Sequence, residues 1–169
     1  MKYIPKSFLF SLLMLGGCSG SETPPVTERE GEPLVTSFSA GDAQMNAAME
    51  KARGTLSQFE ERLAHPPASQ SYIALKGRFE EDGVVEHMWV SDVEVTPEGY
   101  RGKLGNEPVN LVKVVLGQPV LVRREEVSDW MAVDDNALVG GYTLRVQRAQ
   151  LPADKRAEFD ASVGFRIED

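Results

Sequence analysis

The strongest periodic pattern of the chain runs through residues 42–63 and is that of an amphipathic helix. Apolar side chains recur there at spacings of 4, 3, 4, 3 and 4 residues, at Met45, Met49, Ala52, Leu56, Phe59 and Leu63. This period places them on one helical face. Asp42 is a candidate N-cap, and His65-Pro66-Pro67 ends the pattern because proline donates no backbone hydrogen bond. We therefore predict a helix whose apolar face packs on a core.

Beyond these prolines the hydrophobic period changes to two, which is typical of strands. Residues 71–79 and 84–90 alternate on either side of a glycine-containing turn and predict a hairpin. The same pattern predicts further short strands, at 93–96, 100–104, 120–122 and 142–146. Residues 152–159 predict a short polar helix that Leu151 and Phe159 can dock.

These elements together predict the fold class α+β. We expect an N-terminal amphipathic helix packed on an antiparallel sheet of five or six short strands, with a short helix at the C-terminal end. Short strands separated by glycine turns suit a strongly bent sheet or a small SH3-like half-barrel under the helix. The folded unit is expected to be one domain over residues 42–169.

The first 17 residues have the layout of a secretory signal peptide. Lys2 and Lys6 give a positive start, an apolar stretch follows, and Leu15-Gly16-Gly17-Cys18 resembles the lipobox of bacterial lipoproteins. The resemblance implies cleavage before Cys18 and attachment of fatty acyl chains, palmitate among them, to this residue. Ser19 follows the cysteine, whereas retention in the inner membrane typically uses Asp there, so the resemblance favours the outer membrane, facing the periplasm.

Residues 18–41 are predicted to be the lipidated cysteine and a flexible tether. Ser, Thr, Glu, Gly and three prolines dominate this segment, which has too few large apolar side chains to offset the entropy of ordering. Its 23 residues after Cys18 give a random-coil length of about 25 Å. We expect the tether to hold the domain clear of the bilayer surface.

The amino-acid composition argues against several classes of function for this protein. Cys18 is the single cysteine of the 169 residues, so internal disulfides and multi-cysteine metal sites are excluded. The formal net charge is −8, and removal of Lys2 and Lys6 with the signal peptide takes it to −10. An acidic protein is a poor partner for nucleic acid. With two histidines in the chain we predict no metal site, and no motif indicates a cofactor.

Four polar clusters stand out within the region of predicted strands. They are Glu86-His87-Met88-Trp89, Gly102-Lys103-Leu104-Gly105-Asn106-Glu107-Pro108, Ser128-Asp129-Trp130-Met131 and Gly140-Gly141-Tyr142-Thr143. Their order and spacing resemble the YegJ-like domain, a bacterial family of unknown function, from about Phe59 to about Leu151. The resemblance implies an α+β fold and a bacterial source, and it supplies no reaction, catalytic residue or cofactor.

The clusters also supply the candidates for chemistry. His87 could act as a general acid or base with Asp129 or Glu107, because a carboxylate can orient an imidazole. No nucleophile motif such as GxSxG, SxxK or HExxH occurs. The candidates for ligand binding form a longer set: Glu86, His87, Trp89, Asn106, Glu107, Asp129, Trp130 and Tyr142.

Each candidate also has a structural interpretation. His87 beside Trp89 fits a half-buried pair, Asn106 fits a turn that its side chain caps, and Gly140-Gly141 fits a tight turn or close backbone approach. Ser128 or Asp129 could cap a helical turn while Trp130 anchors the core. We expect an envelope lipoprotein that acts as a non-catalytic binding module for a protein or envelope component. One alternative is a small, hydrolase-like enzyme centred on His87 with Asp129 or Glu107, and another is a purely structural lipoprotein.

Overall fold

The computed structural model describes residues 26–27, 35–36 and 42–168. A six-stranded antiparallel sheet forms the centre, in the order β6-β5-β4-β3-β7-β8. Its strands are β3 (Gln70–Glu81), β4 (Val84–Thr96), β5 (Gly99–Leu104), β6 (Pro119–Val122), β7 (Val127–Asp134) and β8 (Ala137–Gly140). The other elements are the paired strands β1 (Val26–Thr27) and β2 (Val35–Thr36), the helices α1 (Ala43–Gly54), α2 (Leu56–Ala64), α3 (Tyr142–Gln150) and α4 (Ala153–Val163), and the 3₁₀ turn η1 (Arg124–Glu126).

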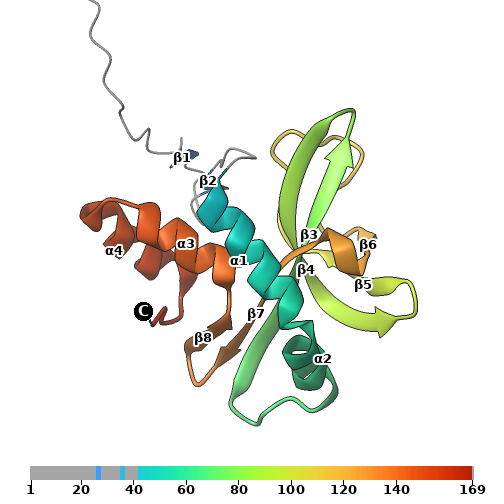
Figure 1. Ribbon diagram of the computed structural model, residues 1–169, viewed down its shortest axis with the longest axis horizontal. Helices are drawn as coiled ribbons and strands as arrows, with labels where there is room; N and C mark the ends of the chain where they lie inside the picture. Colours follow the sequence, from blue (N-terminus) through green and yellow to red (C-terminus); the bar gives the residue numbers. More distant parts are fainter. Residues whose placement is uncertain (1–25, 28–34, 37–41, 169) are drawn as a thin grey trace, which may run out of the picture.

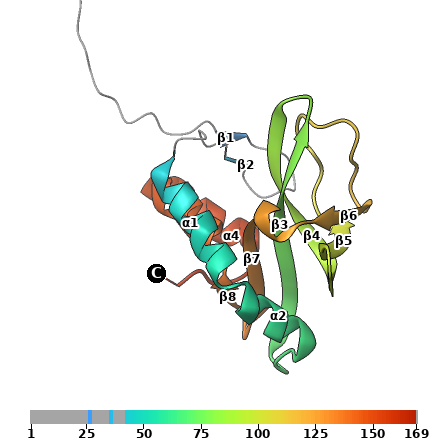
Figure 2. The same ribbon diagram turned by 45° about the vertical axis from the view of Figure 1, so that its right-hand side comes forward.

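Helices cover both faces of the sheet (Figure 1, Figure 2). Adjacent residues of a strand point to opposite faces, and Ala74 and Leu75 of β3 accordingly belong to different cores. Leu75 joins α1 and α2 through Phe59 and Trp130, whereas Ala74 joins α3 and α4 through Phe159. The α+β class and the N-terminal amphipathic helix are therefore confirmed.

The predicted helix over residues 42–63 is two helices that meet at Thr55. Asp42 caps the first as expected, accepting hydrogen bonds from the backbone N–H groups of Gln44 and Met45 at 2.9 Å. Gly54 ends α1, and the Thr55 hydroxyl accepts a hydrogen bond from Trp130 Nε1 at 2.9 Å. The break at Thr55 therefore ties the helix pair to the centre of β7.

The secondary structure from β7 to α3 differs from the one that the sequence pattern predicts. Residues 142–146 were predicted as a strand and form the first half of α3, and β7, which holds Asp129 and Trp130, was not predicted. The reason lies in Gly140 and Gly141, both at positive φ, which turn the chain off the sheet. A Cβ on Gly140 would lie 2.5 Å from the Trp130 carbonyl oxygen, so the expected close backbone approach is confirmed.

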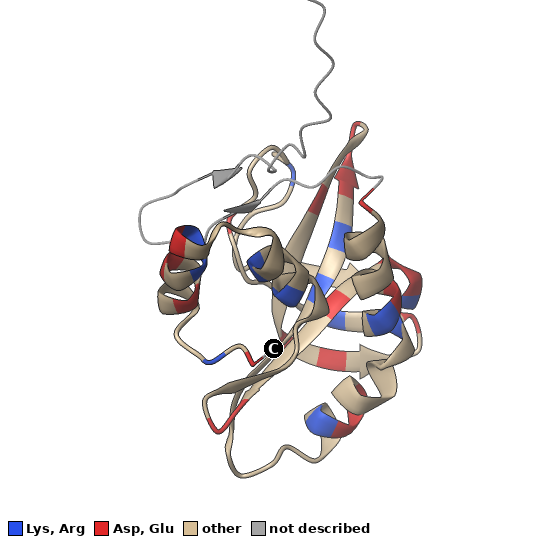
Figure 3. Ribbon diagram, turned by 60° about the vertical axis from the view of Figure 1, so that its left-hand side comes forward, with Lys and Arg blue, Asp and Glu red and all other residues tan. Residues whose placement is uncertain are grey.

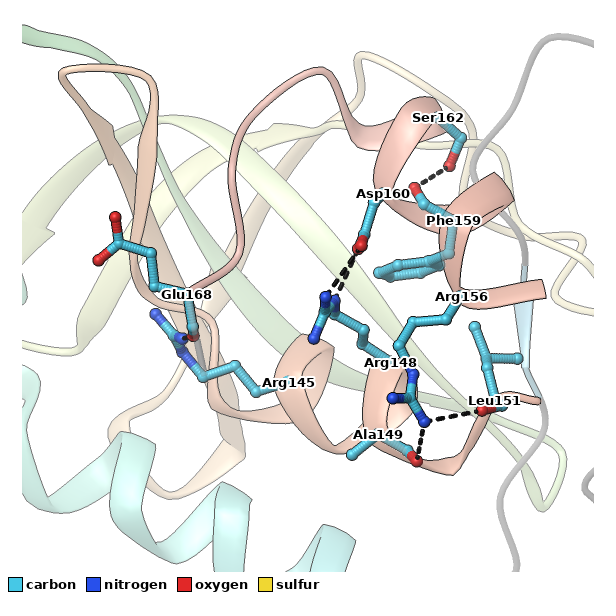
Figure 4. Close-up of polar contacts among 9 residues, drawn as sticks. All are labelled: Arg145, Arg148, Ala149, Leu151, Arg156, Phe159, Asp160, Ser162 and Glu168. Atoms are coloured by element: carbon cyan, nitrogen blue, oxygen red, sulfur yellow. Dashed lines mark hydrogen bonds and ion pairs between the residues drawn. The ribbon is translucent and has the colours of Figure 1, made fainter. Parts of the chain in front are cut away.

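The two C-terminal helices are locked together by arginines (Figure 4). Arg148 of α3 donates two hydrogen bonds to Asp160 of α4, at 2.7 and 2.9 Å, in the bidentate geometry that makes such pairs strong. Arg156 donates to the backbone carbonyls of Ala149 and Leu151, where α3 ends. The predicted C-terminal helix is confirmed as α4, and it is fixed to the sheet by Phe159.

Candidate functional site

Three strands bring the polar clusters onto one face of the sheet. In the register of β4, β3 and β7, Lys76 lies between Trp89 and Asp129. His87 lies opposite Arg78, two residues along each strand from Trp89 and Lys76, on the side of the β3–β4 turn. Since alternate residues of a strand share a face, all five side chains lie on the face that α3 and α4 cover in part.

Asp129 is fully buried and acts as the cap of α3. Its carboxylate accepts hydrogen bonds from the backbone N–H groups of Trp130 (2.8 Å), Tyr142 (3.1 Å) and Thr143 (2.8 Å). The Thr143 hydroxyl donates a fourth at 2.6 Å. Burial raises the pKa of Asp129, while the Thr143 hydrogen bonds and the charge of Lys76 act in the opposite direction. The oxygens that could orient a histidine are thus occupied by the fold.

Lys76 lies between the cap of α3 and Trp89 and contacts both. Its Nζ lies 5.1 Å from the centre of the Trp89 ring and donates to the Thr143 hydroxyl at 3.4 Å. Burial lowers the pKa of Lys76, and the nearby Asp129 carboxylate opposes this effect. Sequence reasoning missed Lys76, and it singled out the cluster of Thr143 without its contact to Asp129, because nothing in the local sequence shows that these residues meet.

His87 remains exposed at the rim of this face. Desolvation, together with the charges of Lys76 and Arg78, lowers the pKa of His87 to about 4. Among the described residues, no hydrogen bond joins His87 to Asp129 or Glu107. Glu107 is exposed on the loop after β5. The imidazole is therefore neutral at pH 7 and has cations, not an orienting carboxylate, as its main charged neighbours.

Asn106 and Glu86 hold the loop that follows β5. The Asn106 side-chain oxygen accepts a hydrogen bond from the backbone N–H of Trp89 at 2.8 Å, which extends the pairing of β4 beyond Leu104. Glu86 accepts hydrogen bonds from the backbone N–H groups of Val109, at 2.9 Å, and Asn110. The cluster of Trp89 is therefore hydrogen-bonded to the cluster of Asn106. In the same way, Asp129 is hydrogen-bonded to Tyr142 and Thr143 at the start of α3.

Trp130 and Tyr142 belong to the core. Trp130 is fully buried and lies 5.9 Å from the ring centre of Phe59, while its contact with Tyr142 is edge-on at 6.2 Å. Lys51 of α1 lies over the Tyr142 ring at 5.0 Å. The interpretation of Trp130 as a core anchor agrees with this packing.

A feature that the sequence analysis did not identify is an exposed apolar surface beside the β3–β4 turn. We call it the apolar end, and it consists of Val84, Val85, Val109, Val112, Val115 and Leu116. These six are two-thirds of the nine large apolar side chains that are exposed in the part of the chain the structure describes. The run from Val109 to Leu116, with only Asn110 and Lys113 polar, was the available signal. The loop is tied to the β3–β4 hairpin by hydrogen bonds from its backbone N–H groups to Glu81 and Glu86, so these exposed apolar side chains gather at one end of the molecule, as they do at many interaction sites.

Two classes of site find no support in the described residues. Within 26–27, 35–36 and 42–168, no group of three or more His, Cys, Asp or Glu side chains could hold a metal ion. No helix of the described ranges is long and apolar enough to cross a membrane. Cys18 and most of the predicted tether lie outside the described residues.

Comparison with known proteins places the folded part in one family. Residues 42–167 match the family described as "Uncharacterized protein conserved in bacteria (DUF2314)". A Neisseria meningitidis serogroup B protein named "Putative ankyrin repeat protein" is 31% identical over 147 residues, which cover 82% of this chain and 58% of that protein. The Escherichia coli K12 protein named "Uncharacterized protein YegJ" is 28% identical over 119 residues, covering 70% of this chain and 76% of that protein.

The comparisons agree with the resemblance drawn from the four clusters. The chain spans little more than half of the Neisseria relative, at 58% of its length. No solved structure matches the chain. Because the family match covers the whole described sheet and all four helices, the chain belongs to the uncharacterised bacterial family DUF2314.

Proposed function

We propose that this protein is a lipid-anchored binding module of the bacterial envelope. In this proposal Cys18 carries the acyl chains, and the domain faces the periplasm from the outer membrane. The domain binds a protein or another envelope component and catalyses no reaction. The apolar end is its binding surface, and this exposed surface is the observation that carries the proposal.

The state of the polar candidates supports binding over turnover. Asp129 is saturated by four hydrogen bonds that cap α3, and Asn106 and Glu86 are engaged with backbone N–H groups. A general base needs a lone pair directed at a substrate, and a nucleophile needs such a base within reach. His87, near pKa 4, is a weak base without a carboxylate partner among the described contacts.

The Neisseria relative supports the same reading from another direction. That protein is named a putative ankyrin repeat protein. Ankyrin repeats stack into extended concave surfaces that bind other proteins. A role in recognition for the present chain is in keeping with that name.

Two measurements test the proposal. Cys18→Ser should move the protein from the membrane fraction to the soluble fraction, and a variant that stays with the membrane would contradict the anchor. A photo-crosslinking residue at position 112 should capture an envelope component in intact cells, while the same residue at position 95, an exposed valine outside the apolar end, should not. Equal capture at both positions, or none at either, would contradict the binding surface.

A further inference from the structure

We infer that the apolar end contacts the bilayer to which Cys18 is attached, so that residues 109–116 form a second, reversible membrane contact. This inference rests on the proposed lipid anchor and names the ligand of the proposed binding surface. The ligand that we assign to the apolar end is the lipid bilayer.

The side chains of the apolar end suit lipid better than protein. All six are Val or Leu, and Val112, Val115 and Leu116 are 80%, 58% and 50% exposed. Protein interfaces take most of their binding energy from Trp, Tyr and Arg, and Leu and Val are under-represented among their strongest contacts. Aliphatic side chains do, in contrast, enter a bilayer favourably.

The loop presents these side chains from a fixed backbone. Leu111 and Val114 point inward and pack with Met88 and Leu104 on the sheet. Glu86 holds one half of the loop, and Glu81 accepts hydrogen bonds from the backbone N–H groups of Val112, at 3.0 Å, and Lys113, at 2.9 Å. Leu111 and Val114 are thus held against the sheet, while the neighbouring Val112 and Val115 are exposed. Such preorganisation lowers the entropic cost of binding.

The position of the apolar end matches the point from which the anchor leads away. In Figures 1 and 2 the turn of the β3–β4 hairpin and the loop after β5 lie at the upper end of the molecule, and the N-terminal end of α1 is its upper end. Cys18 is separated from Asp42 by 23 residues, and within them β1 and β2 pair antiparallel. An anchor attached on this side lets the apolar end reach the same bilayer.

Charge around the apolar end predicts which lipids it accepts. The turn of the β3–β4 hairpin is acidic (Figure 3), with Glu80 49% and Asp82 80% exposed. Lys113, in the middle of the loop, lies 2.9 Å from Asp82. Anionic headgroups repel such a surface, so the contact should favour zwitterionic lipid, unlike the basic surfaces that bind most peripheral proteins to membranes.

The test uses the lipidated full-length protein held in phosphatidylcholine vesicles, with tryptophan as a depth reporter. Val112→Trp places the reporter in the apolar end, and Val95→Trp is the matched control at an exposed strand position elsewhere. The unaltered protein gives the background of Trp89 and Trp130. Phosphatidylcholine brominated on its acyl chains should quench the added fluorescence at position 112 at least about twofold more than at position 95, because insertion to the acyl boundary brings the ring near bromine.

Each outcome decides the inference. Greater quenching at position 112, reduced when about a third of the lipid is anionic, supports it. Equal quenching at both positions in vesicles that carry the protein overturns the lipid contact and leaves the anchor intact; a protein captured at position 112 by the crosslinking in intact cells would then be the ligand. Protein that fails to float with the vesicles overturns the anchor, and the lipid contact with it.

Discussion

Replacement of Asp129 by alanine should destabilise the fold strongly, because four donors lose their acceptor at once. Two of these donors, the N–H and the hydroxyl of Thr143, belong to a residue that is 3% exposed. A buried donor left without a partner costs about 1–3 kcal/mol, and loss of a helix cap costs about 0.5–2 kcal/mol. Because water can enter the vacated site, these costs do not add fully.

We expect Asp129→Ala to lower the free energy of unfolding by about 3–5 kcal/mol, because two or more buried donors lose their acceptor together, each at a cost of about 1–3 kcal/mol. That is a large share of the roughly 5–15 kcal/mol by which domains are stable. Asp129→Asn, which keeps one acceptor oxygen, should lie between the alanine variant and the wild type. The matched control is Glu158→Ala, since the Glu158 carboxylate is 54% exposed and pairs with Lys155 at 3.0 Å within α4; it should cost less than about 1 kcal/mol.

Urea denaturation followed by tryptophan fluorescence and far-ultraviolet circular dichroism measures these differences from the midpoint and slope of each curve. Trp130 lies next to Asp129 and is fully buried, so its emission reports the same region. If Asp129→Ala unfolds within about 1 kcal/mol of the wild type, the cap is unimportant.

Three further predictions follow from the same contacts. Gly140→Ala should cost about 2–4 kcal/mol in chemical denaturation, because its Cβ would meet the Trp130 carbonyl oxygen at a positive φ; a loss under about 1 kcal/mol would contradict the close approach. Glu86→Ala should leave global stability nearly unchanged yet speed hydrogen exchange of the loop amides at 109 and 110, and unchanged exchange would show that another contact fixes the loop. The imidazole of His87 should titrate in NMR near pH 4. Since this folded-state pKa is depressed, His87 contributes stability that is fully present above about pH 6.5 and is lost as the pH falls toward 4; Arg78→Gln should raise the pKa, and a midpoint of the unaltered protein near 6.5 would contradict the cationic environment.

The sequence predicts well the elements whose side chains repeat with a clear period. The stripe from Met45 to Leu63 identified the buried face of α1 and α2, and the alternation of 71–79 and 84–90 identified β3 and β4. Long periodic segments report burial directly, because one face must be apolar. These elements required no knowledge of the tertiary fold.

Elements that depend on distant partners were not predictable in the same way. Val127–Asp134 is buried along nearly its whole length, so β7 lacks the alternation that a half-exposed strand shows. Tyr142–Val146 alternates like a strand, yet Asp129 supplies a cap from β7 and the segment becomes helical. The partners of Asp129 in α3 and of Asn106 in β4 lie 13–17 residues away, and local sequence gives no sign of such pairings.

The same distinction explains the candidate site. The four polar clusters were recognisable as unusual, but their roles became clear only when the register showed which residues meet. The apolar end is the opposite case: its valines are visible in the sequence, and only their exposure shows that they are not core.

We propose that the folded domain of this protein is held at the membrane by acyl chains on Cys18. Intact mass spectrometry of the protein purified from membranes tests it most directly. We expect a chain that begins at Cys18 and carries the added mass of its acyl chains. A chain that still begins at Met1, or one that begins at Cys18 with an unmodified thiol, would contradict it.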